Sequence, residues 1–296
     1  MKRFADCYAL IENSILKIGN DKLKRAWDIS TPSPKVISVF DPICEREWVG
    51  KAPYYDSLRL RDLPLYAMPV IRMSVRKDNF HNISEKHLWV TVSLSYPNSE
   101  LIWDHRIWPE LPIIVSQFRL WKRSIRTTPV RKEGFCDDGY SHFYPVDDRL
   151  EFFGLCTKHL RYSAKALNAQ SDYSDNPVSE KGGLIYSKEH IRLQGNYLYL
   201  RDLSRPGGLL ALKLAPPPQE HLNYPGFDFS LSGGTLAIAG SGISAKELNL
   251  KEMVRSYGYA IGVTDGSWES GFNLCHLLYR KRMKPNPGKD FSISIV

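Results

Sequence analysis

Alternating hydrophobic and polar positions dominate the chain and predict short β-strands. Segment 87–96 alternates in this way and ends at a Pro-Asn-Ser sequence, which is typical of a strand closed by a turn. A second strand is expected at 100–107, and an apolar run at 113–120 predicts a third after a proline-marked break. Because the connections are short, we expect these three strands to form an antiparallel meander.

Further strands are expected on both sides of this meander, and two helices are expected after it. Near the N-terminus, 11–18 and 22–29 flank Gly19-Asn20-Asp21, which supplies turn chemistry for a hairpin. Later strands are expected at 190–203, 208–215 and 234–240. Helical spacing is found at 245–253, with Ser244 as the N-cap, and at 270–283, where the basic end suits the helix dipole.

Two other segments lack periodicity and are expected to be irregular. Segment 128–148 is rich in Gly, Pro and Asp and predicts a long surface loop, and 168–183 predicts a second polar excursion. Segment 284–289 is expected to be a linker, and 290–296 has the composition of a strand beginning. Since we find no internal repeat and no composition shift, 1–283 is expected to be one large, mainly β domain.

The composition of the 296-residue chain indicates a globular protein with a large core, because 43% of its residues are hydrophobic and 24% are charged. A net charge of +8 could indicate nucleic acid, but the basic runs are short and outside any known nucleic-acid module, so that partner is not expected. No stretch is long enough to cross a membrane. The chain as given shows no signal peptide, which leaves the location open between the cytoplasm and, if a signal was removed, the periplasm.

The familiar catalytic sequence motifs are absent: there is no GxSxG elbow, no Walker loop and no HExxH zinc motif. Five cysteines without a CxxC pair do not indicate a zinc or redox site, and no metal or cofactor is expected. A glycosidase needs two carboxylates, and the predicted loops could supply them, although loop acids are more often only solvated. The candidates are Asp137, Asp138, Asp147, Asp148, Glu151, Asp172 and Asp175.

A histidine and a carboxylate would suit a second chemistry, the acid–base opening of an aldose ring. His142 or His159 together with Glu151 could supply the two groups. This alternative would make the chain an aldose-epimerase-like enzyme, and it depends on analogy of fold.

Tryptophans next to polar residues are the remaining signal, because sugar rings stack their apolar faces on aromatic side chains. Trp48, Trp103, Trp108 and Trp268 all have polar neighbours in predicted loops or strand ends. Packing in the core is the more frequent role of such residues. Carbohydrate binding by Trp48, Trp103 and Trp108 is therefore one hypothesis beside that structural role.

The order of these segments resembles the N-terminal β-supersandwich of retaining α-galactosidases, glycoside hydrolase family 36 and its clan. The segments that carry the resemblance are 10–27 (LIENSILKIGNDKLKRAW), 106–114 (RIWPELPII), 172–180, 193–196 (LQGN), 208–213 (GLLALK), 224–229 (YPGFDF) and 255–259 (RSYGY) with the helix up to Arg282. It covers nearly the whole chain as an overall pattern, without a catalytic signature.

The resemblance implies a large antiparallel, galactose-mutarotase-like β-supersandwich over 1–283 that is not catalytic by itself. In the family, the catalytic aspartates lie on a (β/α)8 barrel, and the resemblance implies that 284–296 is a linker and the start of that barrel. No catalytic residue is carried over. A loop of the sandwich could approach the sugar, and Asp41 and Trp48 are the candidates. The partners implied are carbohydrate, the barrel and a second copy of the chain, and a free-standing carbohydrate-binding protein is a further alternative.

Overall fold

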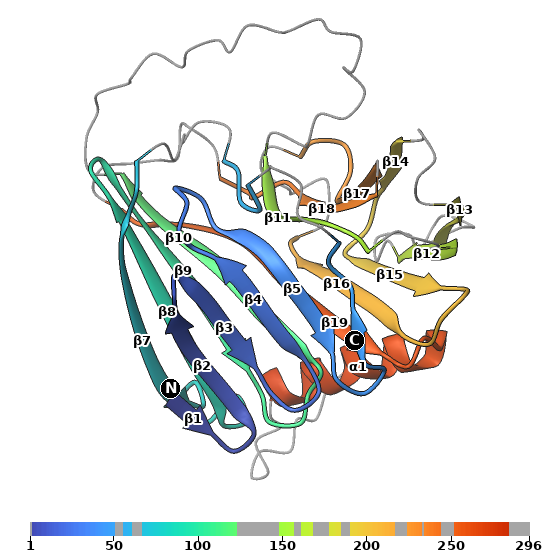
Figure 1. Cartoon of the computed structure of the whole chain (residues 1–296), viewed down its shortest axis with the longest axis horizontal. Helices are drawn as coiled ribbons and strands as arrows, with labels where there is room; N and C mark the ends of the chain where they lie inside the picture. The colour runs from blue at the N-terminus through green and yellow to red at the C-terminus, as the bar shows by residue number, and fades with distance from the viewer. Residues whose placement is uncertain are drawn as a thin grey trace, which may run out of the picture.

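The computed structural model describes most of the chain in separate stretches. These are residues 2–50, 56–60, 67–122, 148–156, 161–167, 178–184, 190–216, 224–232, 234–243 and 252–283. The described part is mainly β, with three antiparallel sheets and one C-terminal helix (Figure 1). The mainly β fold expected from the alternating pattern is therefore confirmed.

The strands form a six-stranded, a nine-stranded and a four-stranded sheet. The first sheet contains, in order, β1 (Lys2–Phe4), β2 (Cys7–Glu12), β3 (Ile15–Gly19), β4 (Lys24–Asp28), β5 (Lys35–Asp41) and β6 (Arg46–Glu47). The large sheet has the order β13 (Val178–Leu184), β12 (Arg161–Leu167), β15 (Tyr197–Asp202), β16 (Gly208–Leu214), β19 (Val254–Thr264), β10 (Ile113–Lys122), β9 (Ser99–Ile107), β8 (His87–Tyr96) and β7 (Val70–Asp78). The small sheet contains β11 (Arg149–Gly154), β18 (Thr235–Ala239), β17 (Phe229–Ser232) and β14 (His190–Leu193).

The first and small sheets together cover one face of the nine-stranded sheet, which we call its inner face. Figure 1 shows β2–β5 in front of the large sheet, and the small sheet extends this layer where Val49 pairs with Leu155. Trp27, Trp103 and Phe153, one from each sheet, belong to the same buried cluster. Because strand side chains alternate between faces, the apolar half of each strand can fill this core while the other half turns away.

The C-terminal helix α1 (Trp268–Arg282) covers part of the opposite, outer face of the nine-stranded sheet. Ser267 is its N-cap, and the Ser267 side chain accepts a hydrogen bond from the backbone N–H of Ser270. Leu274 and Leu278 pack against outer-face residues such as Leu210 and Ala260 in a second buried cluster. The helix expected at 270–283 is therefore confirmed, and it begins two residues earlier at Trp268.

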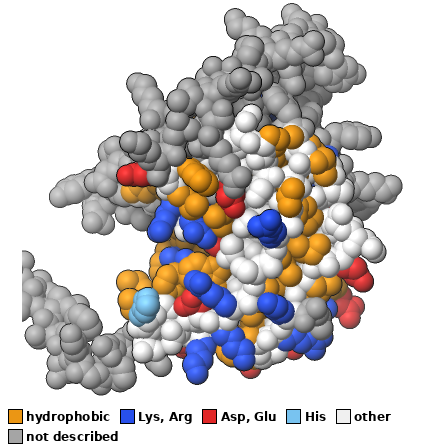
Figure 2. All heavy atoms as spheres, turned by 90° about the vertical axis from the view of Figure 1, so that its left-hand side faces the viewer, with side chains coloured by type: hydrophobic (Ala, Val, Ile, Leu, Met, Phe, Trp, Pro, Cys, Tyr) orange, Lys and Arg blue, Asp and Glu red, His pale blue; other side chains and the backbone are white. Residues whose placement is uncertain are grey.

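The strand β7 forms one edge of the nine-stranded sheet and carries exposed basic side chains. Arg72, Arg76 and Lys77 are exposed on this strand, and charged edge residues discourage pairing with a strand of another molecule. Figure 2 looks at this side of the protein and shows Lys and Arg side chains interspersed with hydrophobic ones. The basic character of the chain is thus evident on this side.

Several sequence predictions are confirmed and others are wrong in detail. The meander is present as β8–β9–β10, and the expected hairpin is β3–β4. The segment 11–18 is not one strand, because Asn13 and Ser14 have φ values of 49° and 59° and form a turn between β2 and β3. The segment 190–203 is likewise two strands, β14 and β15, in different sheets.

The expectation of an irregular segment up to residue 183 is also wrong, since β13 pairs with β12 over 178–184. The composition of this strand does not predict a strand, because Gly and charged residues occupy it. Its pairing with the neighbouring strand β12 determines its structure. The predicted loop at 128–147, the predicted helix over 245–251 and the predicted linker and strand at 284–296 lie outside the described residues.

Candidate functional site

A groove lies between the C-terminal end of α1 and the outer face of the nine-stranded sheet. It consists of two cavities of about 270 and 100 Å³, which share Arg106 of β9 and Arg282 of α1 as lining residues. We call it the Arg106–Arg282 groove. The larger cavity is also lined by Phe80, Ile83, Ser84, Trp108, Tyr279 and Met283. The smaller one is also lined by Asp104, Val115, Ser116, Gln117, Leu214 and Gly258.

The alternation of β9 decides which of its residues face the groove. Trp103 and Ile107 join the core between the sheets, so Asp104 and Arg106 point to the outer face. The last turn of α1 adds Arg282 from the other side of the groove. Residues from distant parts of the sequence therefore line one cavity.

The two arginines carry most of the charge of the groove. Arg106 is half-buried and its guanidinium carbon lies 4.4 Å from the ring centre of Phe80 and 4.8 Å from that of Trp89. Burial, followed by the nearby positive charge of Arg282, lowers the pKa of Arg106 to about 10. Burial also lowers the pKa of Arg282. Since a pKa of about 10 is still well above neutral pH, Arg106 stays charged in the groove.

The carboxylate that lines the groove is already engaged. Asp104 accepts hydrogen bonds from Trp89 Nε1 at 2.9 Å and Thr91 Oγ1 at 2.7 Å. It also accepts from Arg119 Nε at 2.7 Å and Nη2 at 3.1 Å. Within the described part of the chain, by contrast, neither Arg106 nor Arg282 has an ion pair or a hydrogen bond through its guanidinium. The groove thus presents two positive charges whose N–H donors are not used by the residues that the structure describes.

Apolar side chains form the other wall of the groove. Trp108 is 1% exposed and lies at its base, whereas Ile83, Tyr279 and Met283 at the rim are 60%, 49% and 69% exposed. Exposed apolar groups beside a largely apolar cavity with a few charged groups are typical of binding surfaces. The groove therefore combines a cationic side with an aromatic and aliphatic side.

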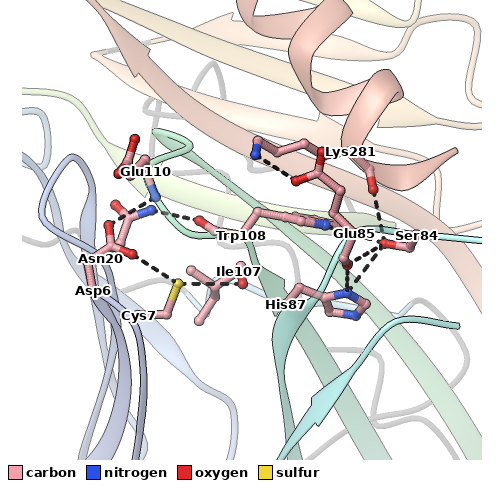
Figure 3. Close-up of polar contacts among 10 residues, drawn as sticks. All are labelled: Asp6, Cys7, Asn20, Ser84, Glu85, His87, Ile107, Trp108, Glu110 and Lys281. Carbon is pink, nitrogen blue, oxygen red and sulfur yellow. Dashed lines mark hydrogen bonds and ion pairs between the residues drawn. The ribbon is translucent and has the colours of Figure 1, made fainter. Parts of the chain in front are cut away.

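The base of the groove is fixed by polar contacts between the chain segments that meet there (Figure 3). Trp108 Nε1 donates to Ser84 Oγ at 3.4 Å, and Ser84 Oγ donates to the carbonyl of Lys281 at 3.1 Å. Lys281 Nζ forms an ion pair with Glu85 at 2.9 Å. The loop between β7 and β8 is thereby tied to the last turn of α1, whose carbonyls lack partners within the helix.

Asn20 holds the Trp108 corner from the opposite side. Its Nδ2 donates to the backbone carbonyls of Trp108 at 3.1 Å and Leu111 at 2.8 Å (Figure 3 shows the Trp108 bond). Its Oδ1 accepts from the backbone N–H of Leu23 at 2.9 Å. One side chain from the β3–β4 turn therefore connects the first sheet to the base of the groove.

Substitution of Asn20 by alanine is expected to lower the free energy of unfolding by about 2 to 4 kcal/mol, because it leaves several buried backbone groups without partners. Chemical denaturation of both proteins measures the difference. The control is Gln194→Ala, which removes an exposed hydrogen bond to the Gly226 carbonyl and should change stability by about 0.5 kcal/mol or less. Equal effects of the two substitutions would contradict the role of Asn20.

The aromatic and acidic residues proposed for sugar binding are buried. Trp48, Trp103, Trp108 and Asp41 are each 1% exposed. The guanidinium of Arg46 covers Trp48 at 3.8 Å, and Asp41 caps its own turn by accepting from the backbone N–H of Ile43 and Cys44. In this arrangement a sugar has no open ring face on which to stack. The structure does not bring these residues together, and among them Trp108 alone lines the groove.

Of the acid and histidine candidates, Glu151 and Asp148 lie within the described residues. Glu151 is 1% exposed and forms an ion pair with Arg25. Asp148 accepts a hydrogen bond from the backbone N–H of Ser241 at 3.1 Å. Outside the described residues lie His142, His159, Asp137, Asp138, Asp147, Asp172 and Asp175. The pairing of Glu151 with either histidine therefore stays a prediction.

Within the described stretches, no group of three or more His, Cys, Asp or Glu side chains has the arrangement of a metal site. Among the same stretches, no helix is both long enough and apolar enough to span a bilayer.

Sequence reasoning missed the pairing of Arg106 with Arg282 and the part played by Phe80 and Asn20. Arg106 stands between two of the proposed tryptophans, and Arg282 lies in the basic end of the predicted helix. The strand alternation could have placed Arg106 on the face opposite Trp103. Nothing local could have shown that the end of α1 lies over that face.

In comparisons of sequence, no family model matches this chain, and no curated protein matches it. Comparison of structures gives a different result. The chain has the β-sandwich fold that forms one portion of each of several α-galactosidases, including enzymes of glycoside hydrolase family 36. The resemblance named from the order of segments is therefore confirmed at the level of the fold.

Two of these enzymes illustrate the similarity. The α-galactosidase AgaB of Geobacillus stearothermophilus aligns with 93% of this chain at 7% identity and a TM-score of 0.54, over 43% of its own length. The α-galactosidase of Lactobacillus brevis aligns with 92% at 8% identity and a TM-score of 0.53, over 42% of its own length. The chain thus spans less than half of the enzymes it resembles.

Proposed function

We propose that this chain is a non-catalytic β-sandwich domain of an α-galactosidase-like glycoside hydrolase, which supports a (β/α)8 barrel elsewhere in the same polypeptide. The observation that carries the proposal is the unequal coverage of the structural matches. About nine-tenths of this chain corresponds to 42–43% of each enzyme, so most of each enzyme has no counterpart here. Residues 1–283 would form the sandwich, and 284–296 would be a linker and the start of the barrel.

The state of the buried carboxylates supports a structural role. Glycosidase chemistry needs two carboxyl groups that face a sugar. In this chain Glu151, Asp202 and Asp228 are buried and paired with Arg25, Arg46 and Lys213. Such pairs connect strands of the sandwich and are not open to a substrate.

The exposed apolar rim of the groove supports a packing role for this end of the domain. Ile83, Tyr279 and Met283 cluster where α1 ends, and these side chains lose contact with water when a second domain or a second copy covers them. A barrel that follows α1 would lie close to this rim. Association of two chains through the same rim is the alternative use of the surface.

The test is a hydrolysis assay of the 296-residue chain with aryl α-galactosides and related aryl glycosides. We expect no turnover above the buffer rate, while a family 36 α-galactosidase in parallel shows that the assay works. Turnover that persists after repurification would contradict the non-catalytic role. Polarimetry of fresh galactose solutions tests the aldose-epimerase alternative, which a protein-dependent gain in mutarotation rate would favour.

A further inference from the structure

We propose that the Arg106–Arg282 groove binds a small anionic ligand, with its carboxylate or phosphate group between the two guanidinium groups and its apolar portion against Phe80 and Tyr279. This inference adds a ligand site to the domain. It does not depend on the proposed scaffold role, since the groove is formed by the described residues alone.

The unpaired state of the two arginines is the first argument. Arg25, Arg46 and Arg119 have low exposure, and each has a carboxylate partner. Arg106 and Arg282 are also half-buried, yet within the described residues they have no such partner. Two like charges in a partly desolvated groove repel each other, and a bound anion would neutralise them.

The chemistry of the guanidinium group is the second argument. Each arginine offers a planar set of N–H donors that matches the two oxygens of a carboxylate or phosphate. Asp104 does not compete for these donors, because its oxygens already accept from Trp89, Thr91 and Arg119. The guanidinium of Arg106 packs against two neighbouring rings, those of Phe80 and Trp89, whose centres lie 5.1 Å apart, and these contacts restrict its orientation before a ligand arrives.

The size and lining of the groove indicate the class of ligand. The larger cavity of about 270 Å³ is near the lower end of small-molecule sites, roughly 300 Å³, and suits one ring. Its apolar wall would contact that ring while the arginines hold the charged group. An acidic sugar or a sugar phosphate has this combination of features, and the shared element is the anion.

The backbone next to the groove gives independent support. Phe80 and His81, in the loop between β7 and β8, have φ values of 48° and 53°, a left-handed conformation that is uncommon outside glycine. The loop keeps this shape through the bond from the Ser84 N–H to the Asn79 carbonyl and the contacts of Ser84 with α1. The strained conformation places the Phe80 ring on Arg106, which is the arrangement that a prepared site needs.

The experiment is titration calorimetry of the whole chain with galacturonate and, separately, with inorganic phosphate. Galactose is the matched neutral probe, because it differs from galacturonate by a hydroxymethyl group in place of the carboxylate. We expect one or both anions to bind and galactose to bind at least about tenfold more weakly. Phosphate alone would identify a phosphoryl ligand, and galacturonate alone a carboxylate ligand.

Variants locate the bound anion. Arg106→Gln and Arg282→Gln should each weaken anion binding about tenfold or more, whereas Arg72→Gln, an exposed arginine of β7 outside the groove, should change it less than about twofold. Arg106→Lys keeps the charge and removes the planar fork, and we expect an intermediate loss. The melting temperature of each variant shows whether it is folded. If Arg106→Gln does not fold, Arg282→Gln alone tests the site.

Two results would overturn the inference. One is that neither galacturonate nor phosphate binds at about 10 mM, a concentration at which titration calorimetry still detects a weak site. The other is anion binding that Arg72→Gln reduces as much as the groove variants do, since that pattern indicates attraction by the basic surface as a whole. Because no catalytic readout is used, neither result bears on the hydrolase proposal.

Discussion

Replacement of Arg25 by methionine should lower the free energy of unfolding by about 3–5 kcal/mol, because it leaves the Glu151 carboxylate buried without its partner. The side chains of Arg25 and Glu151 are 0% and 1% exposed, and Nη2 lies 3.0 Å from Oε2. The guanidinium also stacks on Trp27 at 4.4 Å. The pair joins β4 of the first sheet to β11 of the small sheet, so the substitution weakens the contact between these two sheets. Urea unfolding measures it.

The dependence of this loss on pH gives a sharper readout. Burial raises the pKa of Glu151 and Arg25 opposes that rise, so the substitution should raise the folded-state pKa further. A carboxyl group whose folded pKa exceeds the unfolded value of about 4.3 contributes stability below that value and loses it as pH rises toward the folded pKa. The destabilisation by Arg25→Met should therefore be smaller near pH 4.5 than at neutral pH.

Two further proteins control this experiment. The double substitution Arg25→Met with Glu151→Leu removes both charges and should recover a large part of the loss. Lys17→Met breaks the exposed pair with Glu12 and should destabilise the protein far less than Arg25→Met does, because solvent screens this pair. If the double variant is as unstable as the single one, the destabilisation does not come from the unpaired carboxylate.

The second large effect is expected for Trp103→Ala, about 3–5 kcal/mol, because a large buried ring is removed from the centre of the core. The Trp103 ring lies 5.0 Å from that of Trp27 in an edge-on arrangement and 5.2 Å from that of Phe118 in a stacked one. The contact with Trp27 crosses the interface of the first and nine-stranded sheets, and the contact with Phe118 lies within the nine-stranded sheet. Denaturant unfolding measures the change, and Trp103→Phe should lose less because most of the ring remains.

This substitution also separates a core role from a sugar-binding role for Trp103. Leu277→Ala, at a 46% exposed position of α1, is the control and should change stability by about 0.5 kcal/mol or less. If Trp103→Ala is as stable as this control and loses affinity for a sugar, the residue is a binding platform after all. A large loss of stability in a protein whose fold is otherwise retained supports the core role.

The elements that could be predicted are those whose signal is local. The alternation of β8 predicts a strand because every second residue, such as Val90 and Val92, must reach the core while its neighbours do not. The helix α1 could be predicted since apolar spacing and a basic end are properties of its own sequence. The turn at Asn13 and Ser14 was missed because apolar residues flank it on both sides.

The candidate site could be predicted only in part. The polar neighbours of Trp108 in the sequence make it a candidate, and the residue lines the groove, although it is buried at the base. Trp48 is a candidate for the same reason, and the guanidinium of Arg46 covers its ring. A sequence shows that a tryptophan has polar neighbours and does not show which of them folds over the ring.

Local patterns are enough to predict a mainly antiparallel β protein, with a meander in the middle and a helix near the end, because strand and helix periodicities repeat every few residues. Which face of each strand is covered, and by what, follows from the packing of segments that are distant in the sequence. Arg106 and Arg282 meet because β9 turns one side outward and the end of α1 lies over that side. Such a meeting depends on contacts between distant segments, and periodicity within a segment carries no information about them.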